Sequence, residues 1–190
     1  MGKTAKKKPE KQLPKYRQLY NKETRDLLLD WWRDLEKSTG PRAKLRRCAS
    51  PEEAALHSST YRIMQILPWA SHEAIATMAG ILSHIRSGEN DPLTFGAKMG
   101  KPSEPGGSSP LSELRFQQLL KSRDWNELYR NLRRAVQVLD GNINPLMVAD
   151  LILSWDRDLR DDQHVVSRKS VKFQLSKDYY TNSPPPKKNS

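Results

Sequence analysis

The sequence predicts an all-α protein, a compact assembly of about eight helices in two halves that are joined by a long loop near residues 88–110. Apolar residues recur at the spacing of a helical stripe, with little of the alternation typical of strands. Several stripes begin at a capping residue and end at Gly or Pro. Residues 88–110 break this pattern with four prolines after Gly88 and five glycines in all, which indicates a loop between the halves.

The N-terminal half, residues 21–88, contains several short helices and one long one. The expected elements are a helix with the apolar stripe Leu28, Trp31, Trp32 and Leu35; a short basic helix from Pro41 to about Cys48; one from Pro51 to about His57; one over Thr60–Leu67; and one from Ser71 to Gly88. Gly40-Pro41 is expected to end the first helix. Ser50 and Glu53 form a capping box with Pro51 at the first helical position.

The C-terminal half, residues 111–180, repeats these signals after the loop at 89–110. Helices are expected over residues 111–122, 125–139, 145–155 and roughly 165–180. Asp124 and Glu127 form a second capping box, and Asn144-Pro145 opens the next helix. The last helix rests on Val171, Leu175 and Tyr179, which share one helical register.

The formal net charge of +11 comes from 33 Lys and Arg against 22 Asp and Glu, and it is concentrated at the chain ends. Residues 1–15 hold six lysines against one glutamate, and residues 181–190 hold two lysines and no acid. We expect a disordered basic arm at 1–20 and a disordered tail at 181–190, because both lack apolar surface. Two interpretations stay open for these ends: solubility, and a weak hold on a polyanion that ignores its sequence.

Within the body, cations gather in two blocks. Residues 42–47 carry four cations and no acid, and residues 115–134 carry six cations against two acids. Arginine suits phosphate because its planar fork binds two oxygens. The predicted nucleic-acid-binding residues are Arg46, Arg47, Arg115, Arg133 and Arg134, with Arg42, Lys44, Lys121, Arg123, Lys98 and Lys101 as weaker candidates. Each of them could instead be a solvated or ion-paired surface residue.

Catalytic signatures are missing from the sequence, which contains neither a nucleophile elbow nor a phosphate-binding P-loop. His72-Glu73 begins like a metalloprotease helix, but Ala76 stands at the second ligand position. The four histidines are scattered, and we interpret them as surface or capping residues. We therefore expect no cofactor and no metal. A magnesium site on Asp156, Asp158, Asp161 and Asp162 is a minor alternative, because Arg157 and Arg160 lie among them.

Two further residue types favour structural roles. Cys48, the single cysteine, is interpreted as a buried small residue, although its arginine neighbours could lower its pKa. The tryptophans Trp31, Trp32, Trp125 and Trp155 lie on or beside apolar stripes and are expected in the core. Nucleic-acid contact would then involve mainly phosphates. No apolar run is long enough to span a membrane, and we expect a cytoplasmic protein.

Several segments together resemble one family. Residues 40–48 and 50–53 resemble the N-terminal half of the CasB family, the small subunit of the type I-E CRISPR complex Cascade. Leu111–Leu120 is similar to its S-E-L-R-F-x-x-L-L block. The similarity continues in order through Leu132–Val136, Asn142-Ile143, Asp150-Leu151, Trp155-Asp156 and Asp178–Tyr180, and it covers roughly residues 27–180. The basic arm and the Pro-Lys tail have no counterpart, and Phe173–Leu175 stands where relatives often have a tryptophan.

The resemblance implies a helical, non-catalytic subunit of an antiviral RNA-guided complex. Such subunits occur as two copies that contact each other, the backbone subunits and the large subunit. They stabilise the R-loop by holding the target and displaced DNA strands beside the guide RNA. Two alternatives remain: a pure scaffold whose basic face docks acidic protein surfaces, and, with less support, a metal-dependent nuclease.

Overall fold

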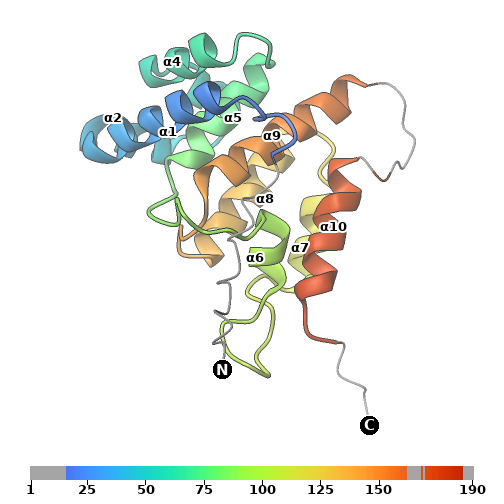
Figure 1. Cartoon of the computed structure of the whole chain (residues 1–190). Coiled ribbons are helices and arrows are strands. Elements are labelled where there is room, and N and C mark those ends of the chain that lie inside the picture. The colour runs from blue at the N-terminus through green and yellow to red at the C-terminus, as the bar shows by residue number, and fades with distance from the viewer. Residues whose placement is uncertain (1–15, 162–167, 169, 186–190) are drawn as a thin grey trace, which may run out of the picture.

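The computed structural model in Figure 1 describes residues 16–161, 168 and 170–185, and these residues contain ten α-helices and no strand. The helices are α1 (Lys22–Lys37), α2 (Thr39–Arg47), α3 (Pro51–Ala55), α4 (Ser58–Ile66), α5 (His72–Leu82), α6 (Phe95–Gly100), α7 (Glu113–Leu120), α8 (Trp125–Val138), α9 (Pro145–Arg160) and α10 (Val171–Asn182). The predicted all-α class is confirmed.

Local capping signals place most helix starts where the sequence predicts them. The Ser71 side chain accepts from the Ala74 N–H at the start of α5, and Asp124 accepts from the Glu127 N–H at the start of α8. The first helix differs at its end. Helix α1 stops at Lys37, and α2 already includes Gly40 and Pro41 in its first turn. Proline is tolerated there because that turn needs no N–H from it.

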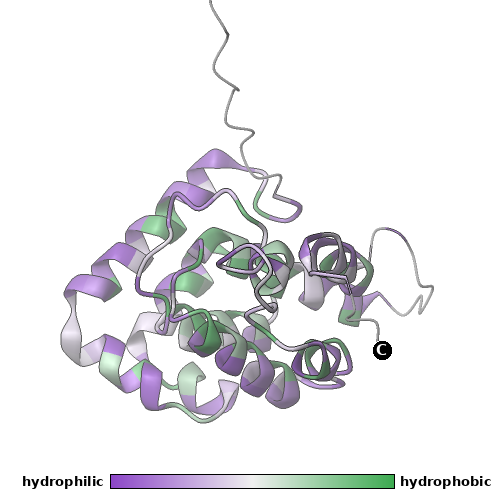
Figure 2. Cartoon of the chain, turned by 90° about the horizontal axis from the view of Figure 1, so that it is seen from below, coloured by the Kyte–Doolittle hydropathy of each residue, from purple (hydrophilic) through white to green (hydrophobic). Residues whose placement is uncertain are grey.

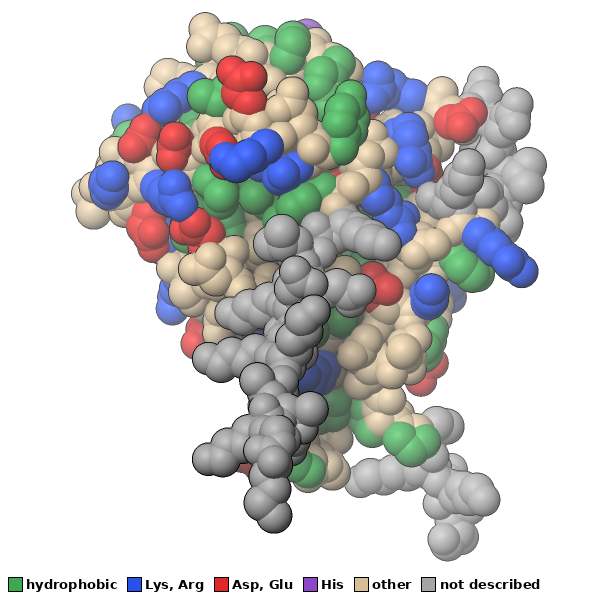
Figure 3. All heavy atoms as spheres, in the orientation of Figure 1, with side chains coloured by type: hydrophobic (Ala, Val, Ile, Leu, Met, Phe, Trp, Pro, Cys, Tyr) green, Lys and Arg blue, Asp and Glu red, His purple; other side chains and the backbone are tan. Residues whose placement is uncertain are grey.

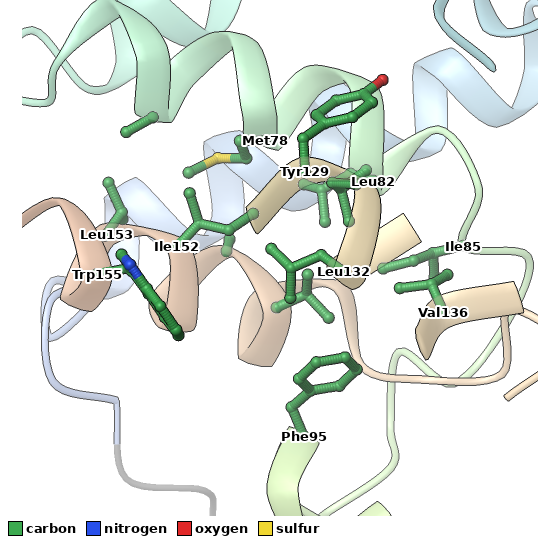
Figure 4. Close-up of a cluster of buried hydrophobic side chains, with 14 of the residues drawn as sticks. Met78, Leu82, Ile85, Phe95, Tyr129, Leu132, Val136, Ile152, Leu153 and Trp155 are labelled. Carbon is green, nitrogen blue, oxygen red and sulfur yellow. The ribbon is translucent and has the colours of Figure 1, made fainter. Parts of the chain in front are cut away.

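Helix α5 lies at the centre of the molecule, and all its residues from Ala74 to Leu82 are buried. It packs against α3, α4, α8 and α9. Figure 4 shows Met78 and Leu82 of α5 in one cluster with side chains of α8 and α9, such as Leu132 and Ile152. Figure 2 shows the hydrophobic stretches mainly on the sides of the helices that face one another. Both predicted halves therefore contribute to one core.

The segment expected to be an irregular loop contains α6, so the prediction of no helix in 88–110 was wrong. Thr94 caps α6 by accepting from the Ala97 N–H, and Phe95 and Met99 are buried. Gly96 and Gly100 let α10 approach closely: a Cβ on Gly96 would lie 2.8 Å from the Leu175 carbonyl oxygen. The sequence pattern does not predict α6, because this helix is short and its two glycines lower its helix propensity.

Part of the expected N-terminal arm is packed. Leu19 is fully buried, and the backbone N–H groups of Arg17, Gln18 and Leu19 all donate to the Asp150 carboxylate at 2.7–3.0 Å. The prediction for residues 16–20 was therefore wrong, because a distant buried carboxylate holds them. Residues 1–15 lie outside the described part of the chain.

The C-terminal helix begins later than predicted. Ser170 caps α10, which continues to Asn182 and so includes two residues assigned to the tail. The sequence placed the helix start within residues 162–167, which lie outside the described residues. The same holds for residues 186–190 of the tail.

Candidate nucleic-acid interface

Arg133 of α8 fixes the end of α2. Its Nη1 donates to the Cys48 carbonyl oxygen at 3.1 Å, and its Nη2 donates to the Arg46 carbonyl oxygen at 3.0 Å. The Tyr129 hydroxyl donates to the same Cys48 oxygen at 3.1 Å. These bonds satisfy carbonyl groups that the end of a helix leaves without partners. They also bring the first arginine block against the second.

Arg42 of α2 likewise donates hydrogen bonds to carbonyl oxygens just after the end of α5. Its Nε donates to the Ser83 carbonyl oxygen at 3.0 Å, and its Nη2 donates to the Ile85 carbonyl oxygen at 2.5 Å. Its side chain is only 14% exposed and also lies 3.7 Å from the Glu36 carboxylate. The guanidinium groups of Arg42 and Arg133 thus hold helix ends together.

Positive charge accumulates where these helices meet. Burial, then the charges of Arg42 and Arg86, lower the pKa of Arg46. Burial of the His84 imidazole, together with the charges of Arg133, Arg46, Arg42 and Arg86, lowers the pKa of His84 to about 4. We call Arg42, Arg46, Arg86 and Arg133 the cationic junction. Like charges held this close favour binding of an anion, which relieves their mutual repulsion.

Exposed cations neighbour the junction residues along α2 and α8. Lys44 and Arg47 of α2 and Arg130 and Arg134 of α8 are exposed, and none has an ion pair or side-chain hydrogen bond among the described residues. Arg46 is half-buried and likewise has no such partner. The donor groups of these five side chains are therefore not used within the described part of the chain. The sequence-based list missed Arg86, a single arginine in a turn with no pattern around it, and left out Arg130 although its helix register already indicated exposure.

Three candidates lie along the α7–α8 hairpin instead. Arg115, Lys121 and Arg123 are exposed, and the hairpin is held by Asn131, whose Nδ2 donates to the Gln118 carbonyl and to the Ser122 hydroxyl oxygen. The backbone N–H of Arg123 donates to Glu127 within the capping box. These three side chains extend the available positive surface along α7.

The two loop lysines belong to another part of the surface. Lys98 and Lys101 lie on or directly after α6, which packs mainly against α10. Lys98 forms an ion pair with Asp91 at 2.5 Å, whereas Lys101 is exposed. On the face seen in Figure 3, cationic side chains are interspersed with acidic ones. Exposed cations such as Arg62 form ion pairs among the described residues, in this case with Asp34.

The acidic run on α9 is engaged in structural contacts. Asp156, 1% exposed, accepts from the Ser71 N–H and pairs with Arg160 at 2.7 Å. Asp158 accepts from the Val171 N–H and pairs with Arg157. Asp162 and His164 lie outside the described residues. Within the described ranges, no group of three or more potential metal ligands gathers.

Burial decides the roles of the cysteine, four of the tryptophans and His84. Cys48 is buried as predicted, and burial raises the pKa of its thiol. Trp31, Trp32 and Trp155 are at most 4% exposed, and Trp125 is partly buried against the core. The interpretation of His84 as a surface or capping residue was wrong, because its Nε2 is buried without a hydrogen-bond partner.

The fold and this interface define a small all-helical protein with a cationic junction where its two sequence halves meet. No helix in the described part of the chain is both long and apolar enough to cross a bilayer. The model of the CRISPR-associated protein Cse2 family matches residues 41–180, and the chain belongs to this family, which comprises the CasB small subunits of type I-E Cascade. No curated protein and no solved structure matches the chain.

Proposed function

We propose that the chain stabilises the R-loop of Cascade without catalysis, by holding DNA strand backbones on Arg46 of the cationic junction and on the exposed cations next to it in α2 and α8. Guide pairing supplies sequence specificity in RNA-guided complexes, so a helper subunit needs only backbone contacts. R-loop formation is nearly balanced in free energy, and a few phosphate contacts suffice to shift it.

One observation carries this proposal. The bonds from Arg133 to the Arg46 and Cys48 carbonyls bring together two arginine blocks that are distant in sequence. Arg46, Arg47, Arg130 and Arg134 then lie around one junction, while Arg42 and Arg133 are occupied by structural bonds. The proposed strand-binding residues are therefore the cations that have no internal partner. The proposed partners are the target and displaced strands, the guide RNA, a second copy of the chain, and the backbone and large subunits.

The test compares two double variants in reconstituted type I-E Cascade. Arg46→Ala with Arg134→Ala removes two available cations, and the control, Lys22→Ala with Arg62→Ala, removes two that form exposed ion pairs on α1 and α4. We expect the first pair to speed R-loop dissociation and to lower the slope of log affinity against log salt by about 1.4–1.8, which is 0.7–0.9 per phosphate contact.

The control pair should leave both quantities unchanged. If instead the first pair abolishes assembly of the complex while the assembled fraction keeps its R-loop stability and salt slope, the chain is a scaffold that docks acidic protein surfaces. That outcome would overturn the proposed function.

A further inference from the structure

A groove lies between the start of α7 and the end of α10. Residues between 108 and 115 line one side, and residues between 179 and 184 line the other. It contains Arg115, one of the sequence-predicted phosphate-binding residues, and Tyr180, whose residue is 44% exposed. An exposed aromatic ring beside an arginine changes the expectation that nucleic-acid contact involves mainly phosphates.

The Tyr180 ring is held in a fixed position. Its hydroxyl donates to Glu113 Oε1 at 3.0 Å and accepts from Gln117 Nε2 at 2.7 Å. Phe116 and Tyr179 stack on each other, with ring centroids 3.8 Å apart. The Tyr180 ring stands at 88° to both, with its centroid 5.7 Å from that of Phe116 and 5.2 Å from that of Tyr179.

These distances place the Tyr180 ring relative to the stacked pair. Because the two distances are nearly equal, Tyr180 lies beside the stacked pair and not on top of it. At such short range, a perpendicular ring covers the edges of the pair with one face. The opposite face therefore points away from the pair, and because the residue is 44% exposed, we infer that a ligand can stack on this face.

The charge of the groove favours a phosphate at one end. Arg115 is exposed and has no partner among the described residues. Glu113, the acid in the lining, already accepts the hydrogen bond of Tyr180. Serine hydroxyls of the same lining, from Ser109 and Ser112 for example, add small polar groups.

We propose that this groove binds an unpaired nucleotide of a single strand, with its base stacked on Tyr180 and its phosphate at Arg115. An aromatic ring beside a cation is the combination that single-strand-binding proteins use without sequence preference. The proposal rests on the proposed function and deepens it, because it assigns a site for an unpaired stretch of a strand apart from the cationic junction.

The experiment measures binding of the full-length chain to three probes of equal length: oligo(dT), oligo(rU) and an abasic DNA strand. Tyr180→Leu removes both the ring and the hydroxyl hydrogen bonds to Glu113 and Gln117. Tyr180→Phe loses the same hydrogen bonds but keeps the ring. We expect Tyr180→Leu to bind dT or rU roughly fivefold more weakly, at the lower end of the value of a base–aromatic stack. Tyr180→Phe should stay within about twofold of the wild type.

The abasic strand separates stacking from other effects. Neither Tyr180 variant should change its binding, whereas Arg115→Gln should weaken all three probes. The dT and rU probes show whether the nucleotide is DNA or RNA. Three results would overturn the groove proposal and point to a structural or protein-docking role. They are unchanged binding of dT and rU by Tyr180→Leu, an equal loss of binding in both Tyr180 variants, and a loss that is equally large on the abasic strand. Such results leave the junction test intact, while failure of the wild type to bind any probe counts against both proposals.

Discussion

The guanidinium of Arg133 lies against the carbonyl oxygen of Cys48, 85 residues earlier in the chain, with Nη1 at 3.1 Å. This contact decides two features of the candidate interface. It occupies an arginine that the sequence presents as a candidate for phosphate, and at the same time it brings the neighbours of that arginine to the end of α2.

Replacing Arg133 should destabilise the fold, whereas replacing its neighbour should not. Arg133→Met leaves the Arg46 carbonyl without its side-chain donor and the Cys48 carbonyl with Tyr129 alone. We expect a loss of about 1.5–3 kcal/mol in the free energy of unfolding, the range for hydrogen bonds to a charged group. Arg134→Met, on the exposed side, should stay within about 0.5 kcal/mol. Urea denaturation checks both, and equal stability of the two variants would contradict the structural role of Arg133.

Adding a methyl group at Gly80 should disturb α5. A Cβ at this position would overlap the ring and hydroxyl of Tyr129. Overpacking of this kind costs about 1–3 kcal/mol. Gly40→Ala is the matched control, because its Cβ would meet nothing within 4 Å, and it should be neutral or stabilising by up to about 1 kcal/mol. Thermal unfolding distinguishes the two, and Tyr129→Leu should reduce the cost of Gly80→Ala if the overlap is its cause.

Removing the Asp150 carboxylate should release residues 17–19. Asp150 is 7% exposed, and its carboxylate accepts from three consecutive backbone N–H groups. We expect Asp150→Ala to lose protection of those amides in hydrogen exchange and about 2–3 kcal/mol of stability. Asp26→Ala, which removes an exposed carboxylate paired with Lys22, should leave the exchange pattern unchanged. Continued protection of residues 17–19 in the Asp150 variant would contradict this anchoring.

His84 should make the protein less stable in mild acid. Its folded pKa of about 4 lies below the ordinary value of 6.5. Between these pH values the unfolded chain binds a proton that the folded chain does not, so stability is lost as the pH falls from 6.5 towards 4. We expect His84 to account for on the order of 1–2 kcal/mol, less than the full linkage value because solvent screens a partly exposed ring.

The measurement is the stability difference between the wild type and His84→Gln at pH 7 and at pH 4.5. The wild type should lose more on acidification than the variant, which cannot titrate at this position. Parallel losses in the two proteins would show that carboxylates alone account for the acid sensitivity.

Much of the fold could be predicted because its signals are local. The side chains of Ser50, Ser71 and Asp124 cap α3, α5 and α8 as their spacing predicts, since a cap involves residues only three positions apart. The buried stripe of α1 follows in the same way from helical periodicity. The short helix α6 could not be predicted, because its glycines matter for contact with α10 and not for the helix itself.

By itself, the sequence determined the all-α class, most helix positions and the two arginine blocks of the candidate interface. Only the tertiary structure decided which arginines remain available. Arg42 and Arg46 lie one helical turn apart in the same block, yet Arg42 donates to carbonyls at the end of α5 and Arg46 has no side-chain partner in the described part of the chain. The physical reason is that a helix end needs donors from outside its own turn, and only the packing of the helices determines which side chain supplies them.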